Sequence, residues 1–283
     1  RAQEPDPDHA GARPRGRLPG CPPRRRLMEV PTSEELPGLS IPLAGRIWRA
    51  VESQTYAVTR QLVTSREEQE RLEELLEGSK PAYQAGTEHL DYLLKTPFRY
   101  QPPKKGGSRF RRPFAPYGVF YGAEHRRTAL AELAYHRYRF LEASPGTEFP
   151  GGEATLTVFA VDHHTSQGID LTLPPLVEQR RYWVEPSDYR TTQTLGERAN
   201  AADIGAIRYE SVRDPVRDTR GHSEGRNVAI LDPATFDPPH HHSAQTWHLY
   251  LGSEEANARR ARAEEGEVVD FRRGELTGPT GED

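Results

Sequence analysis

The hydrophobic residues of this chain are spaced as in a strand in some short stretches and as in a helix in others. The two kinds of stretch follow one another in an irregular order. Strands are predicted at 46–51, 119–121, 155–161, 204–209, 227–231 and 246–251. Helices are predicted at 54–77, 126–141 and 186–202. The segment 96–117 is rich in Pro, Gly and Arg and is predicted to be a long loop. Because the order lacks the regular βαβ rhythm of a doubly wound sheet, we expect an α+β fold: a single mixed-sheet domain flanked by helices.

The two ends of the chain differ in composition from its middle. Only 34% of the 283 residues are hydrophobic and 28% are charged, which favours a compact core with unstructured ends. We predict a disordered Arg/Pro-rich extension at 1–40, one domain at 41–252 and a disordered charged tail at 253–283. Met28 is the only methionine, and we expect it to be the natural start. A disordered basic arm at 1–27 is the alternative.

Charge and cysteine content exclude several classes of protein. The net charge is −4, so a general nucleic-acid binder is not expected. Residues 1–27 carry seven arginines against three acidic residues, and the rest of the chain is therefore acidic. The single cysteine, Cys21, cannot form an internal disulfide or a multi-cysteine metal site. No apolar stretch is long enough to span a membrane, and no secretory signal is present. We expect a cytoplasmic protein without a metal site.

Glu132 is the most informative single position. It lies in an almost wholly apolar part of the predicted helix 126–141, and no Lys or Arg stands three or four residues away to pair with it. An unpaired carboxylate in such surroundings needs solvent or a distant cationic partner. A Glu on the exposed edge of an amphipathic helix is the ordinary interpretation.

Arginines gather in the predicted loop. Arg99 stands between two aromatic residues, and Arg109, Arg111 and Arg112 follow a glycine pair. The planar guanidinium group suits phosphate oxygens, and neighbouring glycines let backbone N–H groups approach an anion. A solvated basic loop is the alternative.

Two further polar positions end or begin predicted strands. Ser211 follows the strand 204–209 and has no base beside it in the sequence, so a turn or cap residue is the ordinary interpretation. Asn227 begins the next strand. The histidine runs at 163–164 and 240–242 are weak metal-site candidates, because consecutive side chains point in different directions. They are interpreted as loop residues. Dinucleotide, nucleotide and hydrolase fingerprints are absent, so any dinucleotide would bind without a Rossmann turn.

Taken in order, these pieces resemble the RES domain, a family named for its Arg, Glu and Ser. The resemblance covers roughly 45–235. It rests on Trp48-Arg49, on Gly-Ser-Arg-Phe at 107–110, on the Gly-Val-Phe-Tyr strand at 118–121, on Glu132 in its helix, on Ser-x-Arg at 211–213 and on Gly-x-Asn at 225–227. The chain departs from the family at Arg111, where a small polar residue is usual, and in the long insert between Arg49 and Arg109. Arg109 is assigned the family's Arg role, with Arg99 as the second candidate.

The resemblance implies an ADP-ribosyltransferase-like fold and an enzyme that cleaves the nicotinamide–ribose bond of NAD⁺, as a glycohydrolase or phosphorylase. It implies that NAD⁺ is a substrate rather than a cofactor. It further implies the toxin of a toxin–antitoxin pair, neutralised by a helix-turn-helix (Xre-like) antitoxin, and leaves open a homo-oligomer.

The same resemblance distributes roles among the candidate residues. Glu132 would stabilise the positive charge that develops on the ribose. Arg109, with Arg49 or Arg99, would hold the pyrophosphate. Tyr121 would pack against nicotinamide or ribose, and Ser211 and Asn227 would hydrogen-bond that end of the substrate. A protein ADP-ribosyltransferase and a non-catalytic binding module that uses the Arg-rich loop remain alternatives.

Overall fold

The computed structural model describes residues 30–53, 62–102, 106–144, 146–262 and 266–277. Its framework is an eight-stranded sheet in the order β1-β2-β5-β4-β3-β6-β7-β8. The strands are β1 (Ile41–Glu52), β2 (Phe120–Ala123), β3 (Ala154–Asp170), β4 (Ala206–Glu210), β5 (Arg226–Ile230), β6 (His242–Leu251), β7 (Glu255–Arg260) and β8 (Val268–Arg272). The sheet is mixed, since β3 and β4 run parallel while neighbouring pairs such as β4–β5 and β6–β7 run antiparallel.

One long strand joins two parts of this sheet. β3 pairs along most of its length with β1. On its other edge, the first part of β3 pairs with β6 and its last three residues pair with β4. β1 also pairs with β2, so β1, β2, β5, β4 and β3 close on themselves. The backbone pairing between β1 and β2 is confined to Trp48 and Ala123.

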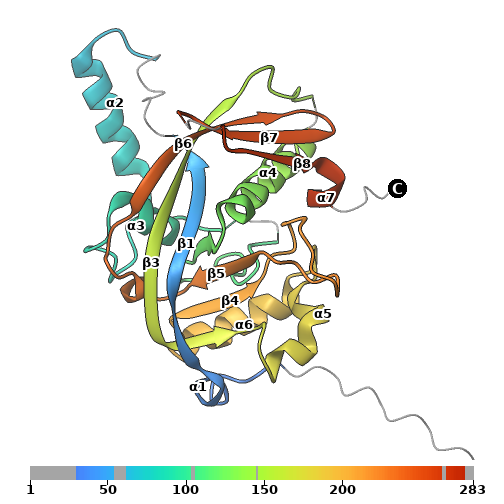
Figure 1. The fold of residues 1–283 in the computed structure, drawn as a ribbon. Coiled ribbons are helices and arrows are strands. Elements are labelled where there is room, and N and C mark those ends of the chain that lie inside the picture. Colours follow the sequence, from blue (N-terminus) through green and yellow to red (C-terminus); the bar gives the residue numbers. More distant parts are fainter. Residues whose placement is uncertain (1–29, 54–61, 103–105, 145, 263–265, 278–283) are drawn as a thin grey trace, which may run out of the picture.

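Seven α-helices and two short 3-10 helices surround the sheet in the described part of the chain (Figure 1). The α-helices are α1 (Leu36–Leu39), α2 (Arg66–Ser79), α3 (Tyr92–Arg99), α4 (Arg126–Glu142), α5 (Arg180–Trp183), α6 (Arg190–Ala201) and α7 (Arg273–Thr277). The 3-10 helices are η2 (Leu176–Gln179) and η3 (Pro233–Thr235). No helix among these residues is long and apolar enough to cross a membrane.

Among the described residues the core consists of three clusters of buried side chains, and α4 dominates one of them. Leu130, Ala134 and Tyr138 are fully buried on one face of α4, and they pack against Leu156 of β3 and Trp247 of β6. The spacing of these apolar positions at four residues explains why this segment is a helix with one buried face. The opposite edge of α4 carries Glu132.

The predicted fold class is confirmed: helices and strands are mixed, and one sheet has flanking helices. The predicted helix 126–141 corresponds to α4, and each of the six predicted strands overlaps an observed one. The helix predicted at 186–202 begins only at Arg190. The helix predicted at 54–77 begins at Arg66, and residues 54–61 lie outside the described part of the chain. The predicted loop 96–117 is wrong at its start, where α3 extends to Arg99.

Both predictions of disordered ends fail for the residues that the structure describes. Residues 36–39 form α1, with Leu36 fully buried, whereas residues 1–29 lie outside the described part. Strands β7 and β8 and helix α7 occupy most of the supposed tail 253–283. Ala256, Ala258, Phe271 and Leu276 are buried there in the cluster of α4. Two of these four buried residues are small alanines, so the composition of the segment gave little sign of its burial.

Candidate active site

A cavity of about 320 Å³ is lined by residues of β1, β2 and α4, next to the pairing of Trp48 with Ala123. Five of the seven candidate residues line it: Arg49, Arg109, Tyr121, Glu132 and Asn227. Its wall is rich in aromatic side chains, namely Trp48, Tyr121, Tyr135, Tyr189 and Tyr209. The sixth candidate, Ser211, reaches the site through a hydrogen bond to Glu132.

Glu132 projects from α4 at the edge of the cavity and is half-buried. One of its oxygens, Oε1, accepts two hydrogen bonds: from Ser211 Oγ at 2.7 Å and from Asn227 Nδ2 at 2.6 Å. Among the described residues no side chain hydrogen-bonds to the other oxygen, Oε2, and no arginine or lysine forms an ion pair with the carboxylate. The carboxylate is thus held in place through one oxygen and leaves the other for a ligand.

The orientation of Ser211 depends on the segment that follows β4. Thr128 Oγ1 of α4 donates to Asp214 Oδ2 at 2.5 Å, and Arg127 forms an ion pair with the same carboxylate at 3.1 Å. Asp214 and Thr128 are fully buried. This contact ties the segment to the helix of Glu132, so that Ser211 and Glu132 keep their separation.

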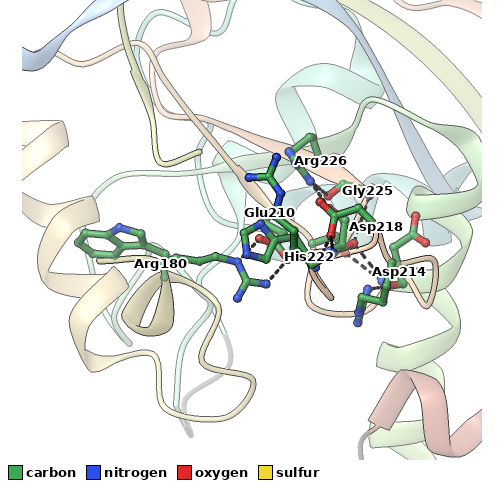
Figure 2. Close-up of polar contacts among 12 residues, drawn as sticks. Arg180, Glu210, Asp214, Asp218, His222, Gly225 and Arg226 are labelled. Atoms are coloured by element: carbon green, nitrogen blue, oxygen red, sulfur yellow. Dashed lines mark hydrogen bonds and ion pairs between the residues drawn. The ribbon is translucent and has the colours of Figure 1, made fainter. Parts of the chain in front are cut away.

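A second ion pair holds the same segment at its start, where β4 ends at Glu210. Arg180 of α5 forms two hydrogen bonds with the buried Glu210, at 2.5 and 2.6 Å, and the backbone N–H of Ser223 donates to Glu210 Oε1 at 2.6 Å (Figure 2). Burial opposes the charge of Glu210, but the hydrogen bonds from Arg180 and Ser223 lower its pKa, so it remains ionised. Because α5 ends at Trp183, this pair also fixes the partner of Arg109 described next.

A tight turn brings Arg109 to the cavity. Ser108 and Arg111 exchange backbone hydrogen bonds, and Gln193 of α6 donates to the carbonyl of Gly106 at 2.6 Å and to that of Ser108 at 3.1 Å. Gly107 has φ = 70°, and a Cβ there would lie 2.3 Å from the carbonyl oxygen of Arg111. A glycine is therefore required at this position.

Three arginines border the cavity without a carboxylate partner among the described residues. Arg109 donates to the carbonyls of Trp183 at 2.9 Å and Glu185 at 3.1 Å, and lies 4.7 Å from the ring centre of Tyr189.

Arg49 donates to the carbonyl of Tyr121 at 2.8 Å, and burial lowers its pKa to about 10. Arg213 is buried and stacks 3.6 Å from the ring centre of Tyr135. Against these three positive charges the cavity wall has one carboxylate, Glu132, so it favours an anionic ligand.

Tyr121 connects the turn to the cavity. Its hydroxyl lies 2.9 Å from Ser108 Oγ and accepts a hydrogen bond from the backbone N–H of Phe110 at 3.1 Å. Burial raises the pKa of Tyr121, so it stays a neutral phenol. The ring forms part of the cavity wall.

Arg99, the second candidate for the family's Arg role, does not line the cavity. It forms an ion pair with Glu77 of α2 at 2.6 Å and lies 4.2 Å from the ring centre of Tyr83. Its position links α2 to α3. Arg111, also in the predicted basic loop, is buried and donates to the carbonyls of Tyr100 and Ala115. The interpretation as a solvated loop therefore does not hold for Arg111.

Comparison with known proteins decides the family. The family model of the RES domain matches residues 81–252. The chain belongs to the RES family. Among solved structures, the chain is similar to one from the M. tuberculosis MbcT–MbcA toxin–antitoxin complex. It has 13% sequence identity and a TM-score of 0.40, and the match covers 71% of this chain and 81% of that chain. No curated protein matches the sequence.

The RES match contains every site residue except those of β1. Trp48 and Arg49 precede residue 81, yet they line the same cavity as Arg109 and Glu132. Several cavity residues were not among the candidates, including Tyr135, His136, Tyr189 and Arg213. Helical spacing gives a signal for two of them, since Tyr135 and His136 stand three and four residues after Glu132. Tyr189 gives no such signal, because it precedes a helix whose direction is set by tertiary contacts.

Proposed function

We propose that this RES protein cleaves the nicotinamide–ribose bond of NAD⁺, with NAD⁺ consumed as a substrate. The observation that carries the proposal is the Glu132 carboxylate, fixed through one oxygen by Ser211 and Asn227, with its second oxygen unbonded among the described residues. Breaking that bond develops positive charge on the ribose, and a fixed carboxylate stabilises such charge. Nicotinamide departs as a neutral base with the electron pair of the broken bond.

The arginines supply the affinity for the rest of the substrate. The diphosphate of NAD⁺ carries two negative charges, and guanidinium groups bind phosphate oxygens through paired N–H groups. Arg49 and Arg109 face the cavity without a carboxylate to compete for them among the described residues. We assign them to the diphosphate, and we assign Tyr121 to the nicotinamide or ribose face. Small-molecule cavities measure roughly 300–1,000 Å³, so this one suits the reacting half of the dinucleotide.

The chemistry is tested by release of nicotinamide from NAD⁺ by the full chain. Glu132→Gln keeps the shape of the side chain and removes its charge, so turnover should fall roughly 100-fold or more. Glu67→Gln, at an exposed position on α2, is the matched control and should leave turnover unchanged. Near-wild-type turnover by Glu132→Gln would contradict the role of this carboxylate. Labelled ADP-ribose attached to a macromolecule would instead indicate a protein ADP-ribosyltransferase.

We further propose, from membership of the RES family, that the protein is a toxin that depletes NAD⁺ in the cytoplasm and is neutralised by a helix-turn-helix antitoxin. Expression of the wild type alone should stop growth and lower cellular NAD⁺, whereas Glu132→Gln should do neither. Coexpression with a helix-turn-helix protein encoded beside it should restore growth and yield a complex. Normal growth and NAD⁺ levels with the wild type would contradict the toxin role.

A further inference from the structure

His136 lines the cavity and takes no part in the substrate contacts proposed above. It lies on α4 four residues after Glu132, and side chains at this spacing lie on the same helix face, one turn apart. Both side chains line the cavity. His136 therefore stands close to the carboxylate that would face the reacting ribose.

The imidazole of His136 is available to a ligand or to water. Neither ring nitrogen forms a hydrogen bond or ion pair within the described part of the chain, and its one ring contact is with Tyr135, edge to face, at 5.2 Å. The side chain is exposed at the cavity, in contrast to the buried Asn227 and Arg213. A water molecule that enters the cavity can reach it.

The charged groups around His136 come from three elements. Glu132 of α4 favours the protonated imidazole, whereas Arg49 of β1 and Arg213 after β4 oppose it. Desolvation is the largest influence and, with the two arginines, it lowers the pKa of His136 below 6.5 despite Glu132. The imidazole is thus neutral near pH 7 and able to accept a proton.

We propose that His136 is the base that takes the proton of water when water attacks C1 of the ribose. The inference rests on the NAD⁺-cleaving function proposed above. In this step the C1–N bond to nicotinamide breaks and its electron pair leaves with neutral nicotinamide. A bond forms between the water oxygen and C1, and the proton released from water passes to a ring nitrogen of His136. The imidazolium then loses this proton to solvent.

This role distinguishes water from phosphate as the acceptor. The phosphate dianion carries negative charge on its attacking oxygen and has no proton to lose from it. Attack by phosphate therefore needs no base, whereas attack by water gains from one by a factor that is typically 100 or more. His136 should matter for formation of ADP-ribose and not for formation of ADP-ribose 1-phosphate.

The experiment measures both products from NAD⁺, with and without phosphate, for the full-length wild type, His136→Gln and His136→Ala. His89→Gln, an exposed histidine outside the cavity, is the matched control. We expect His136→Gln to lower kcat for hydrolysis roughly 100-fold with little change in KM, and to leave phosphorolysis unchanged. Added imidazole should restore hydrolysis to His136→Ala. Hydrolysis by the wild type should decline as the pH falls through the lowered pKa of His136, and this decline should be absent in His136→Gln.

Three results would overturn the inference while nicotinamide release stands: unchanged hydrolysis by His136→Gln, no hydrolysis by the wild type without phosphate, or an equal loss of both products without rescue by imidazole. The last result would show that His136 only supports the fold. Failure of the wild type to release nicotinamide under any condition would contradict the proposed function, and the inference with it.

Discussion

Arg109 and Arg99 show that the role of an arginine depends on its place in the fold. Both stand in aromatic surroundings in the sequence, and both donate to backbone carbonyls in the structure. Arg99 is paired with Glu77, whereas Arg109 has no carboxylate partner in the described part of the chain and borders the cavity. The local sequence does not separate them, since Glu77 lies 22 residues before Arg99.

Arg109→Lys should weaken NAD⁺ binding. Lysine keeps the charge, but its single ammonium group cannot reach the carbonyls of Trp183 and Glu185 and also bind phosphate in a fork. We expect KM for NAD⁺ to rise about tenfold, the equivalent of about 1.4 kcal/mol, with a smaller change in kcat. Arg99→Lys is the control and should leave KM unchanged. The assignment fails if Arg99→Lys raises KM and Arg109→Lys does not.

Among the elements, the turn at 107–111 depends most on one residue. It is held at two points, by the backbone pairing of Ser108 with Arg111 and by Gln193 of α6. Its conformation requires the positive φ of Gly107. Gly106 also has a positive φ, of 80°, but a Cβ there would meet nothing within 4 Å. A side chain at Gly106 would therefore add only backbone strain, whereas a side chain at Gly107 would add backbone strain and a steric clash.

Gly107→Ala should displace the turn and with it Arg109. We expect a loss of about 1–3 kcal/mol in the free energy of unfolding, together with a rise in KM for NAD⁺. Gly106→Ala should cost less, about 1 kcal/mol, because only the conformational preference is affected. Urea denaturation and steady-state kinetics measure both. Equal losses of stability from the two substitutions would show that the clash between the new Cβ at position 107 and the carbonyl oxygen of Arg111 does not contribute.

Elements with a regular apolar pattern could be predicted, and those without one could not. The apolar stripe from Ala129 to Leu141 predicted α4, and alternation at 155–161 predicted the first half of β3. β7 escaped prediction because its buried positions, Ala256 and Ala258, are small and stand among charged residues. α3 escaped because it contains Pro97, which is typical of loops.

On the scale of the whole molecule, the site joins residues that no local pattern connects. Ser211 and Asn227 lie 79 and 95 residues after Glu132, and both bond to the same oxygen. Only the resemblance to RES sequences grouped these residues before the fold was known. Helix α7 contributes as well, since Arg213 beside the cavity donates to the carbonyl of Leu276 at 3.4 Å.

Phe271→Ala should therefore destabilise the whole protein. The side chain is 2% exposed in the cluster that includes α4, and truncation of a buried Phe typically costs about 3–5 kcal/mol in the free energy of unfolding. Val268→Ala, on the same strand but 49% exposed, should cost within about 0.5 kcal/mol. Chemical denaturation compares the two. A loose tail at 253–283 would make both substitutions neutral.

The arginines around the cavity also bear on how such a protein can evolve. Arg49, Arg109 and Arg213 place like charges near one another, and burial already lowers the pKa of Arg49. An anion that enters the cavity relieves this repulsion and so stabilises the fold, whereas the empty protein retains it. Substitutions that neutralise one of these arginines would make the empty protein more stable and less able to bind NAD⁺. Selection for a long-lived protein and selection for an active one thus act on the same side chains in opposite directions.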